Sequence, residues 1–87
     1  LYVESRGRYL EIFSVDEKKI KVIMTMKEME ALAGDELVQC HRSYFVNLRY
    51  VTAVTKGNVV VKKVHDIPLS RDRQKVMEKR YVTELMK

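Results

Sequence analysis

The segment Tyr50–Val64 reads YVTAVTKGNVVVKKV, and it decides the fold class. Two runs rich in β-branched residues, 50–54 and 59–64, flank the triplet Lys56-Gly57-Asn58. Gly and Asn readily supply the positive φ angles that a tight turn needs. The segment is therefore predicted to form a β-hairpin whose second strand extends to Val64.

The same two-residue alternation continues on both sides of this hairpin. Tyr9–Phe13 and Lys19–Ile23 are predicted to form an earlier hairpin around the polar turn Asp16-Glu17-Lys18. On the other side, His65-Asp66 is predicted to be a turn that leads into Ile67-Pro68-Leu69. Pro68 has no amide hydrogen, so it belongs at a sheet edge or a strand end.

Two helices interrupt the strands. Thr25-Met26-Lys27-Glu28 matches a capping box, in which the Thr hydroxyl and the Glu carboxylate each accept from the other residue's backbone N–H. Four apolar residues then follow at helical spacing until Gly34 stops the helix: Met26, Met29, Leu32 and Ala33. A second helix is predicted to begin with Ser70 as its N-cap, and its expected inner stripe is Val76, Tyr81 and Leu85.

This gives about six strands and two short helices, with no regular alternation of strand and helix. The pattern argues against a parallel α/β fold and predicts a mainly β protein, with antiparallel sheets and peripheral helices. A length of 87 residues allows one small domain, 1–87. No apolar run approaches the roughly 20 residues of a membrane helix, and residues 1–5 do not resemble a signal peptide.

The positive charge is concentrated in one part of the chain. The net charge is +5, and residues 37–65 contain five Lys or Arg and no Asp or Glu. Such a stretch is either a surface that faces a polyanion or a chance cluster on a solvated face. The single cysteine, Cys40, cannot form an internal disulfide, which agrees with a reducing cytoplasm. Cys40 is interpreted as a buried strand thiol, with a redox switch as the alternative.

Signatures of catalysis and of cofactor binding are absent from the sequence. There is no glycine-rich phosphate loop, no HExxH motif and no paired CxxC motif, so no metal site and no cofactor are predicted. Cys40 and His41 are adjacent, but neighbouring strand residues point to opposite faces and cannot form a nucleophile–base pair. The chain is therefore not expected to be an enzyme.

The most informative segment is Val38–Leu48, VQCHRSYFVNL. It is rich in side-chain hydrogen-bond donors and lacks carboxylates. Arg42 and Asn47 are of the types best shaped to read guanine and adenine edges. Two interpretations stay open for His41 and Asn47: they contact DNA, or they brace the backbone of a turn and leave only Arg42 free.

Four ordered motifs resemble the LytTR family of bacterial DNA-binding domains. His41–Asn47 is similar to its R-x-H-R-S-[YF]-[IV]-V-N signature, and Tyr2–Ser5 to its opening Y-[IV]-E strand. Thr25–Glu30 resembles the T-L-x-E-L-E helix, and Ile67–Arg71 the [IV]-P-[IV]-S-R motif. The resemblance covers essentially the whole chain. Gln39 departs from it, since many members carry Arg close to this position, and one possible phosphate contact is thereby lost.

The resemblance implies sequence-specific binding of double-stranded DNA by loops that enter successive major grooves. Carried onto this sequence, the contacts fall in the loop Arg6-Gly7-Arg8, with Arg8 as the main reader, at Arg42 and at Arg71. Arginine suits the bidentate contact to guanine O6 and N7. Lys62 and Lys63 are candidate phosphate contacts, and as strand neighbours only one of them is expected to face the DNA.

The family also implies a biological setting. The chain is expected to be the C-terminal part of a longer cytoplasmic response regulator, with a receiver domain before it and without the family's first strand. It is expected to bind direct-repeat promoter sites as a dimer and to bend them. Two alternatives stay open, namely a β-rich protein-interaction module with Arg42 and Arg71 in surface ion pairs, and an RNA-binding sheet with exposed aromatic side chains.

Overall fold

The computed structural model describes all residues from 1 to 87 and contains eight strands, two α-helices and two short 3₁₀ turns. The elements are β1 (Tyr2–Arg6), β2 (Tyr9–Phe13), β3 (Lys19–Val22), α1 (Met26–Leu32), β4 (Leu37–His41), β5 (Tyr44–Asn47), η1 (Leu48–Tyr50), β6 (Val51–Thr55), β7 (Asn58–Val61), β8 (His65–Pro68), η2 (Arg71–Arg73) and α2 (Gln74–Leu85).

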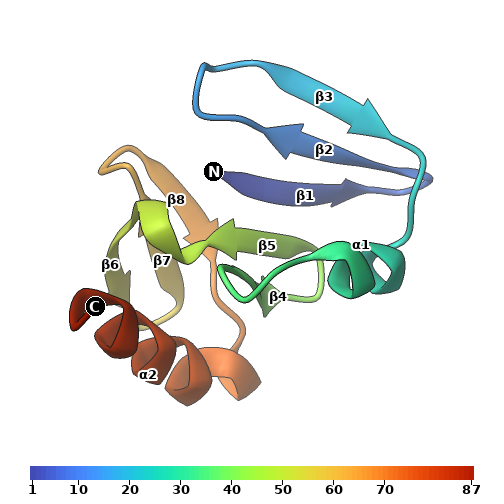
Figure 1. Ribbon diagram of the computed structural model, residues 1–87. Coiled ribbons are helices and arrows are strands. Elements are labelled where there is room, and N and C mark those ends of the chain that lie inside the picture. Colours follow the sequence, from blue (N-terminus) through green and yellow to red (C-terminus); the bar gives the residue numbers. More distant parts are fainter.

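The strands form two antiparallel sheets (Figure 1). A five-stranded sheet has the order β3-β2-β1-β5-β4, and a three-stranded sheet has the order β6-β7-β8. This confirms the predicted mainly β class and both predicted hairpins. The strand count exceeds the prediction because the segment 37–47 folds into a hairpin of two strands, β4 and β5.

The turn between β7 and β8 lies earlier than predicted. Val61 pairs with His65, so the turn spans residues 62–64, and the prediction of a turn at His65-Asp66 is wrong. Lys62 and Lys63 have φ angles of 52° and 66°, and Val64 N donates to Val61 O at 3.2 Å. Two central residues with positive φ are typical of a type I′ turn, whose twist matches that of the strands. The placement of Lys62 and Lys63 on a strand, facing opposite ways, is therefore also wrong.

The capping box of α1 is present as predicted. Thr25 Oγ1 accepts from Glu28 N, and Glu28 Oε1 accepts from Thr25 N, each at 3.1 Å. The helix ends at Leu32, close to the predicted stop, but its apolar stripe is narrower than predicted. Met29 is buried, whereas Leu32 is 71% exposed because the helix ends there and leaves its last apolar side chain uncovered.

The start of α2 differs from the prediction. The hydroxyl of Ser70 donates to Cys40 O at 3.3 Å and caps no helix, and a 3₁₀ turn separates Ser70 from α2. Because a 3₁₀ turn has about three residues per turn, the buried face of α2 is shifted from the predicted stripe. Met77 is buried and Tyr81 partly so, while Val76 and Leu85 are 58% and 65% exposed. Neither helix is long and apolar enough to cross a membrane.

Two hydrophobic clusters share β5. Phe45 belongs to the cluster under α1, with Val3, Leu10 and Met29. Its neighbour Val46 belongs to the larger cluster, which the three-stranded sheet and α2 complete. Successive strand residues point to opposite faces, so β5 contributes one fully buried side chain to each core. Tyr44 is partly buried and Leu48 is buried, which agrees with the core role predicted for them.

Candidate nucleic-acid interface

The turn between β1 and β2 presents Arg8 at its tip. Arg6 pairs with Tyr9, so only Gly7 and Arg8 connect the strands. Gly7 has a φ of +67°, which a residue without a Cβ adopts at little cost. A two-residue turn with Gly first is a compact hairpin connection. The exposed Arg8 side chain therefore extends from a short turn with a defined backbone conformation.

The turn between β4 and β5 presents Arg42 in the same way. His41 pairs with Tyr44, which leaves Arg42 and Ser43 as the two turn residues. His41 Nδ1 accepts from Ser43 N at 3.1 Å, and Gln39 Nε2 donates to Arg42 O at 3.4 Å. His41 and Gln39 thus brace the backbone that carries Arg42. Gln39 lies close to the position where many family members carry arginine, and here its side chain stabilises the turn.

Backbone hydrogen bonds join these turns to the segment that carries Arg71. Ser5 N donates to Ser43 O at 2.8 Å, which places the β1 end beside the β4–β5 turn. Ser70 N donates to Cys40 O at 2.9 Å, which places the start of η2 beside the end of β4. Arg8, Arg42 and Arg71 therefore come from three adjacent segments at one end of the molecule, although 63 positions separate the first from the last in sequence.

The arginines differ in whether they are already paired. None of Arg8, Arg42 and Arg71 lies within 4.0 Å of a carboxylate oxygen, and all three residues are exposed. Arg6 Nε, in contrast, lies 3.0 Å from Glu11 Oε1 and 3.2 Å from Glu4 Oε2. Glu11 is buried, so the ion pair satisfies a carboxylate that water hardly reaches. The Arg6 guanidinium is thus already paired within the domain, although about half of its side chain (51%) stays exposed.

Three further candidates lie at the opposite end of the molecule. Asn47 is the last residue of β5, roughly 10 Å along the strand from Tyr44, which follows the turn of Arg42. Its Oδ1 accepts from Arg49 N at 3.0 Å, so Asn47 caps η1. Lys62 N donates to Tyr50 O at 2.8 Å, which places the β7–β8 turn beside η1. Asn47, Lys62 and Lys63 are therefore not brought together with the arginine turns (Figure 1).

Two residues that the sequence did not single out as site candidates, Lys56 and Gln74, line a hollow together with Arg71. Lys56 is exposed in the β6–β7 turn, and Leu69 N donates to Gly57 O at 2.9 Å, so this turn lies beside the approach to Arg71. Gln74 connects the turn to α2 through two hydrogen bonds, to Gly57 N and Thr55 O. The carboxylate-free segment that contains Lys56 was a signal for the lysine, whereas nothing local in the sequence pointed to Gln74.

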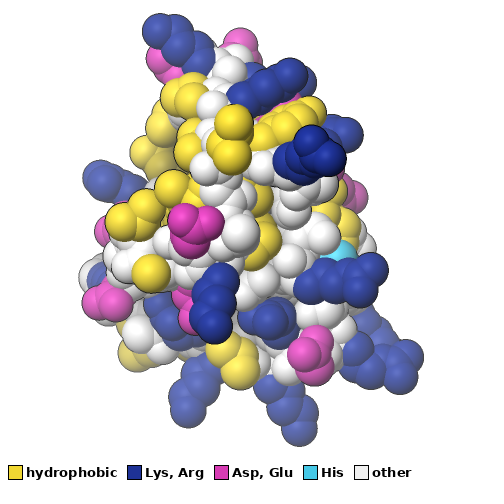
Figure 2. Space-filling view, turned by 90° about the vertical axis from the view of Figure 1, so that its right-hand side faces the viewer, with side chains coloured by type: hydrophobic (Ala, Val, Ile, Leu, Met, Phe, Trp, Pro, Cys, Tyr) yellow, Lys and Arg dark blue, Asp and Glu magenta, His cyan; other side chains and the backbone are white.

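Figure 2 looks onto the end where the β1–β2 and β4–β5 turns lie. Lys and Arg side chains are spread over this face, most densely in its lower half, with only isolated acidic side chains between them. Such a distribution produces a positive potential and attracts polyanions. The charge pattern and the arginine turns therefore mark the same face.

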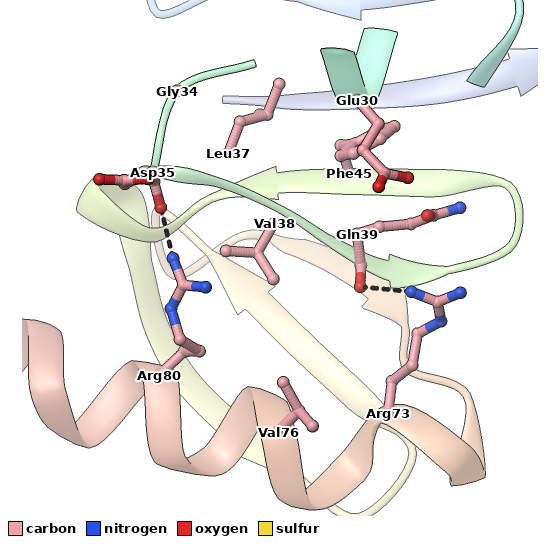
Figure 3. A pocket seen from close by; sticks show the side chains of 10 residues that line it. All are labelled: Glu30, Gly34, Asp35, Leu37, Val38, Gln39, Phe45, Arg73, Val76 and Arg80. Carbon is pink, nitrogen blue, oxygen red and sulfur yellow. Dashed lines mark hydrogen bonds between the residues drawn. The ribbon is translucent and has the colours of Figure 1, made fainter. Parts of the chain in front are cut away.

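A hollow of about 290 Å³ separates β4 from α2 (Figure 3). Arg73 Nη1 donates to Gln39 O at 3.3 Å, and Arg80 Nη2 donates to Asp35 O. On the other sheet, Tyr81 and Gln74 donate to the carbonyls of Thr52 and Thr55 on β6. The segment from Arg73 in η2 to Tyr81 in α2 thus satisfies carbonyls on or beside one edge strand of each sheet, and it protects these edges from pairing with other chains.

Cys40 is fully buried beneath the arginine turns. Burial raises the pKa of its thiol to about 12, so the reactive thiolate is suppressed at neutral pH. The thiol lies 3.5 Å from Pro68 O and 3.9 Å from Tyr44 O. These contacts agree with the interpretation of Cys40 as a buried strand thiol.

The LytTr DNA-binding domain family matches residues 1–81 of the chain. The chain belongs to the LytTR family of DNA-binding domains. A solved structure of the LytTr DNA-binding domain of a Bacillus cereus response regulator superposes with a TM-score of 0.76 at 21% identity, over 91% of this chain and 77% of that one. A comparison with curated proteins finds no match.

Membership of the LytTR family confirms the resemblance that the four motifs indicated, and the superposition confirms the fold. The family match also confirms the expected class, a DNA-binding domain. The likeness to the Bacillus cereus domain, at 21% identity, concerns the fold.

Proposed function

We propose that this domain binds double-stranded DNA in a sequence-specific manner as the output domain of a bacterial transcriptional response regulator. The observation that carries the proposal is the arrangement of Arg8, Arg42 and Arg71. Three exposed arginines without carboxylate partners extend from adjacent turns on one basic face. Family membership supports DNA as the ligand.

The chemistry of base reading suits these side chains. A guanidinium donates two parallel hydrogen bonds to guanine O6 and N7, and each such contact discriminates by about 1–3 kcal/mol against other bases. The short turns that carry Arg8 and Arg42 limit the conformational entropy lost on binding. Arg71 belongs to η2, which Arg73 bonds to Gln39 O on β4, and the following helix α2 is bonded to β6. We propose that these loops enter successive major grooves.

The roles of the other candidates are narrower in this proposal. Arg6 holds Glu11 and only supports the turn of Arg8. His41 presents Nε2 to the DNA, because its Nδ1 is occupied by Ser43 N. Asn47, Lys62 and Lys63 lie away from the arginine turns and make no contact with the same stretch of DNA. The proposal also includes binding to direct repeats as a dimer and bending of the DNA. It further includes a receiver domain before this chain and a cytoplasmic location.

Two competing functions receive less support. A protein-interaction module was expected to hold Arg42 and Arg71 in surface ion pairs, and neither forms one. An RNA-binding sheet needs exposed aromatics on a face that accepts phosphates. Tyr2 and Phe13 do stack on one face of the larger sheet, with ring centroids 4.4 Å apart. Glu4 and Glu11 share that face, however, and would repel a polyanion.

The proposal is tested by binding to fluorescent duplex DNA of mixed sequence, measured at several salt concentrations. Each neutralised phosphate contributes a slope of about −0.9 in log K against log salt. We expect measurable affinity at low salt and a slope of several units, and a site selected from random duplexes should bind more tightly than scrambled DNA. Absence of binding at low salt, or an affinity independent of salt, would contradict the proposal.

A further inference from the structure

We propose that the hollow between the β6–β7 turn and the start of α2 receives a DNA phosphate, with Lys56 as its cation and Gln74 as the residue that positions Lys56. This inference rests on the proposed function and adds a fourth element to the interface. It concerns a lysine and a glutamine that lie outside the family motifs in the sequence.

The hollow has a volume of about 230 Å³ and contains no carboxylate. Its walls are Lys56, Gly57, Leu69, Arg71 and Gln74. Lys56 and Arg71 contribute positive charge from different elements, and neither forms an ion pair within the domain. When Arg71 reaches a base edge, a neighbouring backbone phosphate is the anion available to Lys56. A lysine binds it as a point charge and tolerates any sequence.

Gln74 holds the backbone on both sides of Lys56. Its Oε1 accepts from Gly57 N at 3.1 Å, and its Nε2 donates to Thr55 O at 2.9 Å and to Glu78 Oε2 at 2.8 Å. The Gly57 N–H can only donate, which fixes the amide orientation. One side chain thus connects the turn of Lys56 to the helix that follows Arg71, and sets the separation of the two cations.

Without Gln74, the direct backbone link between the turn and this segment is the bond from Leu69 N to Gly57 O, at 2.9 Å. A lysine on a loosely held turn would lose more conformational entropy on binding a phosphate. We therefore assign Gln74 a positioning role in DNA binding, in addition to its contribution to packing α2 on β6.

The test compares Lys56→Ala, Lys56→Arg, Gln74→Met and the double variant Lys56→Ala/Gln74→Met in the 87-residue chain. Affinity for one duplex is measured by fluorescence anisotropy over a range of salt concentrations. We expect Lys56→Ala to reduce the salt slope by about 0.9 and to weaken cognate and scrambled duplexes by the same factor. Lys56→Arg retains the slope. Gln74→Met, which keeps the length but not the hydrogen bonds, reduces both affinity and slope.

The double variant separates positioning from general damage. If Gln74 acts through Lys56, Gln74→Met has little further effect on affinity once Lys56 is Ala. An equal loss in both backgrounds, or a slope unchanged by Lys56→Ala, overturns the inference. Lys18→Ala is the control, because Lys18 is an exposed lysine in the β2–β3 turn that lines a different hollow, with Leu1 and His65, and already pairs with Asp16. If the unaltered chain does not bind DNA at all, the proposed function fails as well, which is a distinct result.

Discussion

The guanidinium of Arg6 lies 3.0 Å from the carboxylate of Glu11, which is only 5% exposed. Arg6→Ala leaves Glu11 with Lys19, at 3.7 Å, as its one remaining ion-pair partner. We expect a loss of about 1–3 kcal/mol in the free energy of unfolding, measured by urea denaturation. Arg8→Ala, two residues away, should leave stability unchanged and weaken DNA binding. Equal stability of the two variants would show that the ion pair does not stabilise the fold.

Arg8, Arg42 and Arg71 are expected to determine specificity. Replacing one of them with Ala should remove about 1–3 kcal/mol of binding free energy, mainly as discrimination at one position of the site. Replacement with Lys should not restore it, because one ammonium lacks the planar pair of donors. Each variant is measured on a selected site and on scrambled DNA at two salt concentrations. An equal loss on both DNAs would identify phosphate contacts instead.

Lys62 and Lys63 both adopt positive φ, which is unfavourable for residues with a Cβ. The pair Lys62→Asn/Lys63→Gly matches the preferred sequence of a type I′ turn. We expect it to raise the free energy of unfolding by about 1 kcal/mol and to leave DNA affinity and its salt slope unchanged. A reduced slope would instead place these lysines on the DNA.

Cys40 is expected to affect the pH dependence of stability. Burial raises the pKa of the folded thiol to about 12 from an ordinary value of 9.0. Above pH 9 the unfolded chain releases this proton while the folded domain retains it, so stability falls as the pH rises. The fall attributable to Cys40 should reach about 1.4 kcal/mol per pH unit.

The measurement compares urea denaturation of the unaltered chain and of Cys40→Ala between pH 8 and 11, so that contributions of Tyr and Lys cancel. The stability difference between the two proteins should shrink as the pH rises.

DNA binding by the unaltered chain should resist peroxide, because the thiolate is suppressed. Peroxide sensitivity that disappears in Cys40→Ala would revive the redox switch.

His41 is expected to combine two roles that one substitution separates. Its Nδ1 accepts from Ser43 N, so the neutral ring carries its proton on Nε2. His41→Asn offers an acceptor near Nδ1 and removes the Nε2 donor, whereas His41→Ala removes both. We expect only His41→Ala to lower the midpoint of thermal unfolding, and both variants to bind DNA more weakly. Normal DNA binding by His41→Asn would limit His41 to bracing the turn.

The hairpins and the capping box of α1 were predictable because their signals are local. Thr25 and Glu28 are three residues apart, and their hydrogen bonds need no other part of the chain. The pairing of Arg6 with Glu11 was not predictable in this way, since it depends on the register of β1 against β2. The buried face of α2 was also misjudged, because Ser70 bonds to Cys40, 30 residues earlier, and does not cap the helix.

In the candidate site, too, features with local sequence signals could be predicted, whereas those that depend on contacts between distant residues could not. Arg8, Arg42 and Arg71 were proposed as readers through the resemblance to the family, and their proximity depends on backbone bonds between distant segments. Lys62 and Lys63 were selected on charge alone, and charge does not indicate at which end of a sheet a turn lies. Gln74 escaped notice because its role depends on the position of Gly57, 17 residues earlier.

The shared strand β5 implies that this domain melts as one cooperative unit. Phe45 and Val46 belong to different hydrophobic clusters but are consecutive in the chain, so neither cluster can lose its order while the other keeps β5 in place. The slowest-exchanging amide protons should therefore lie on β5 and its neighbours, and should exchange only through global unfolding. A destabilising mutation in either cluster should then lower the fraction of molecules in which the DNA-binding face is folded. This should hold even for a mutation that changes none of the arginine turns.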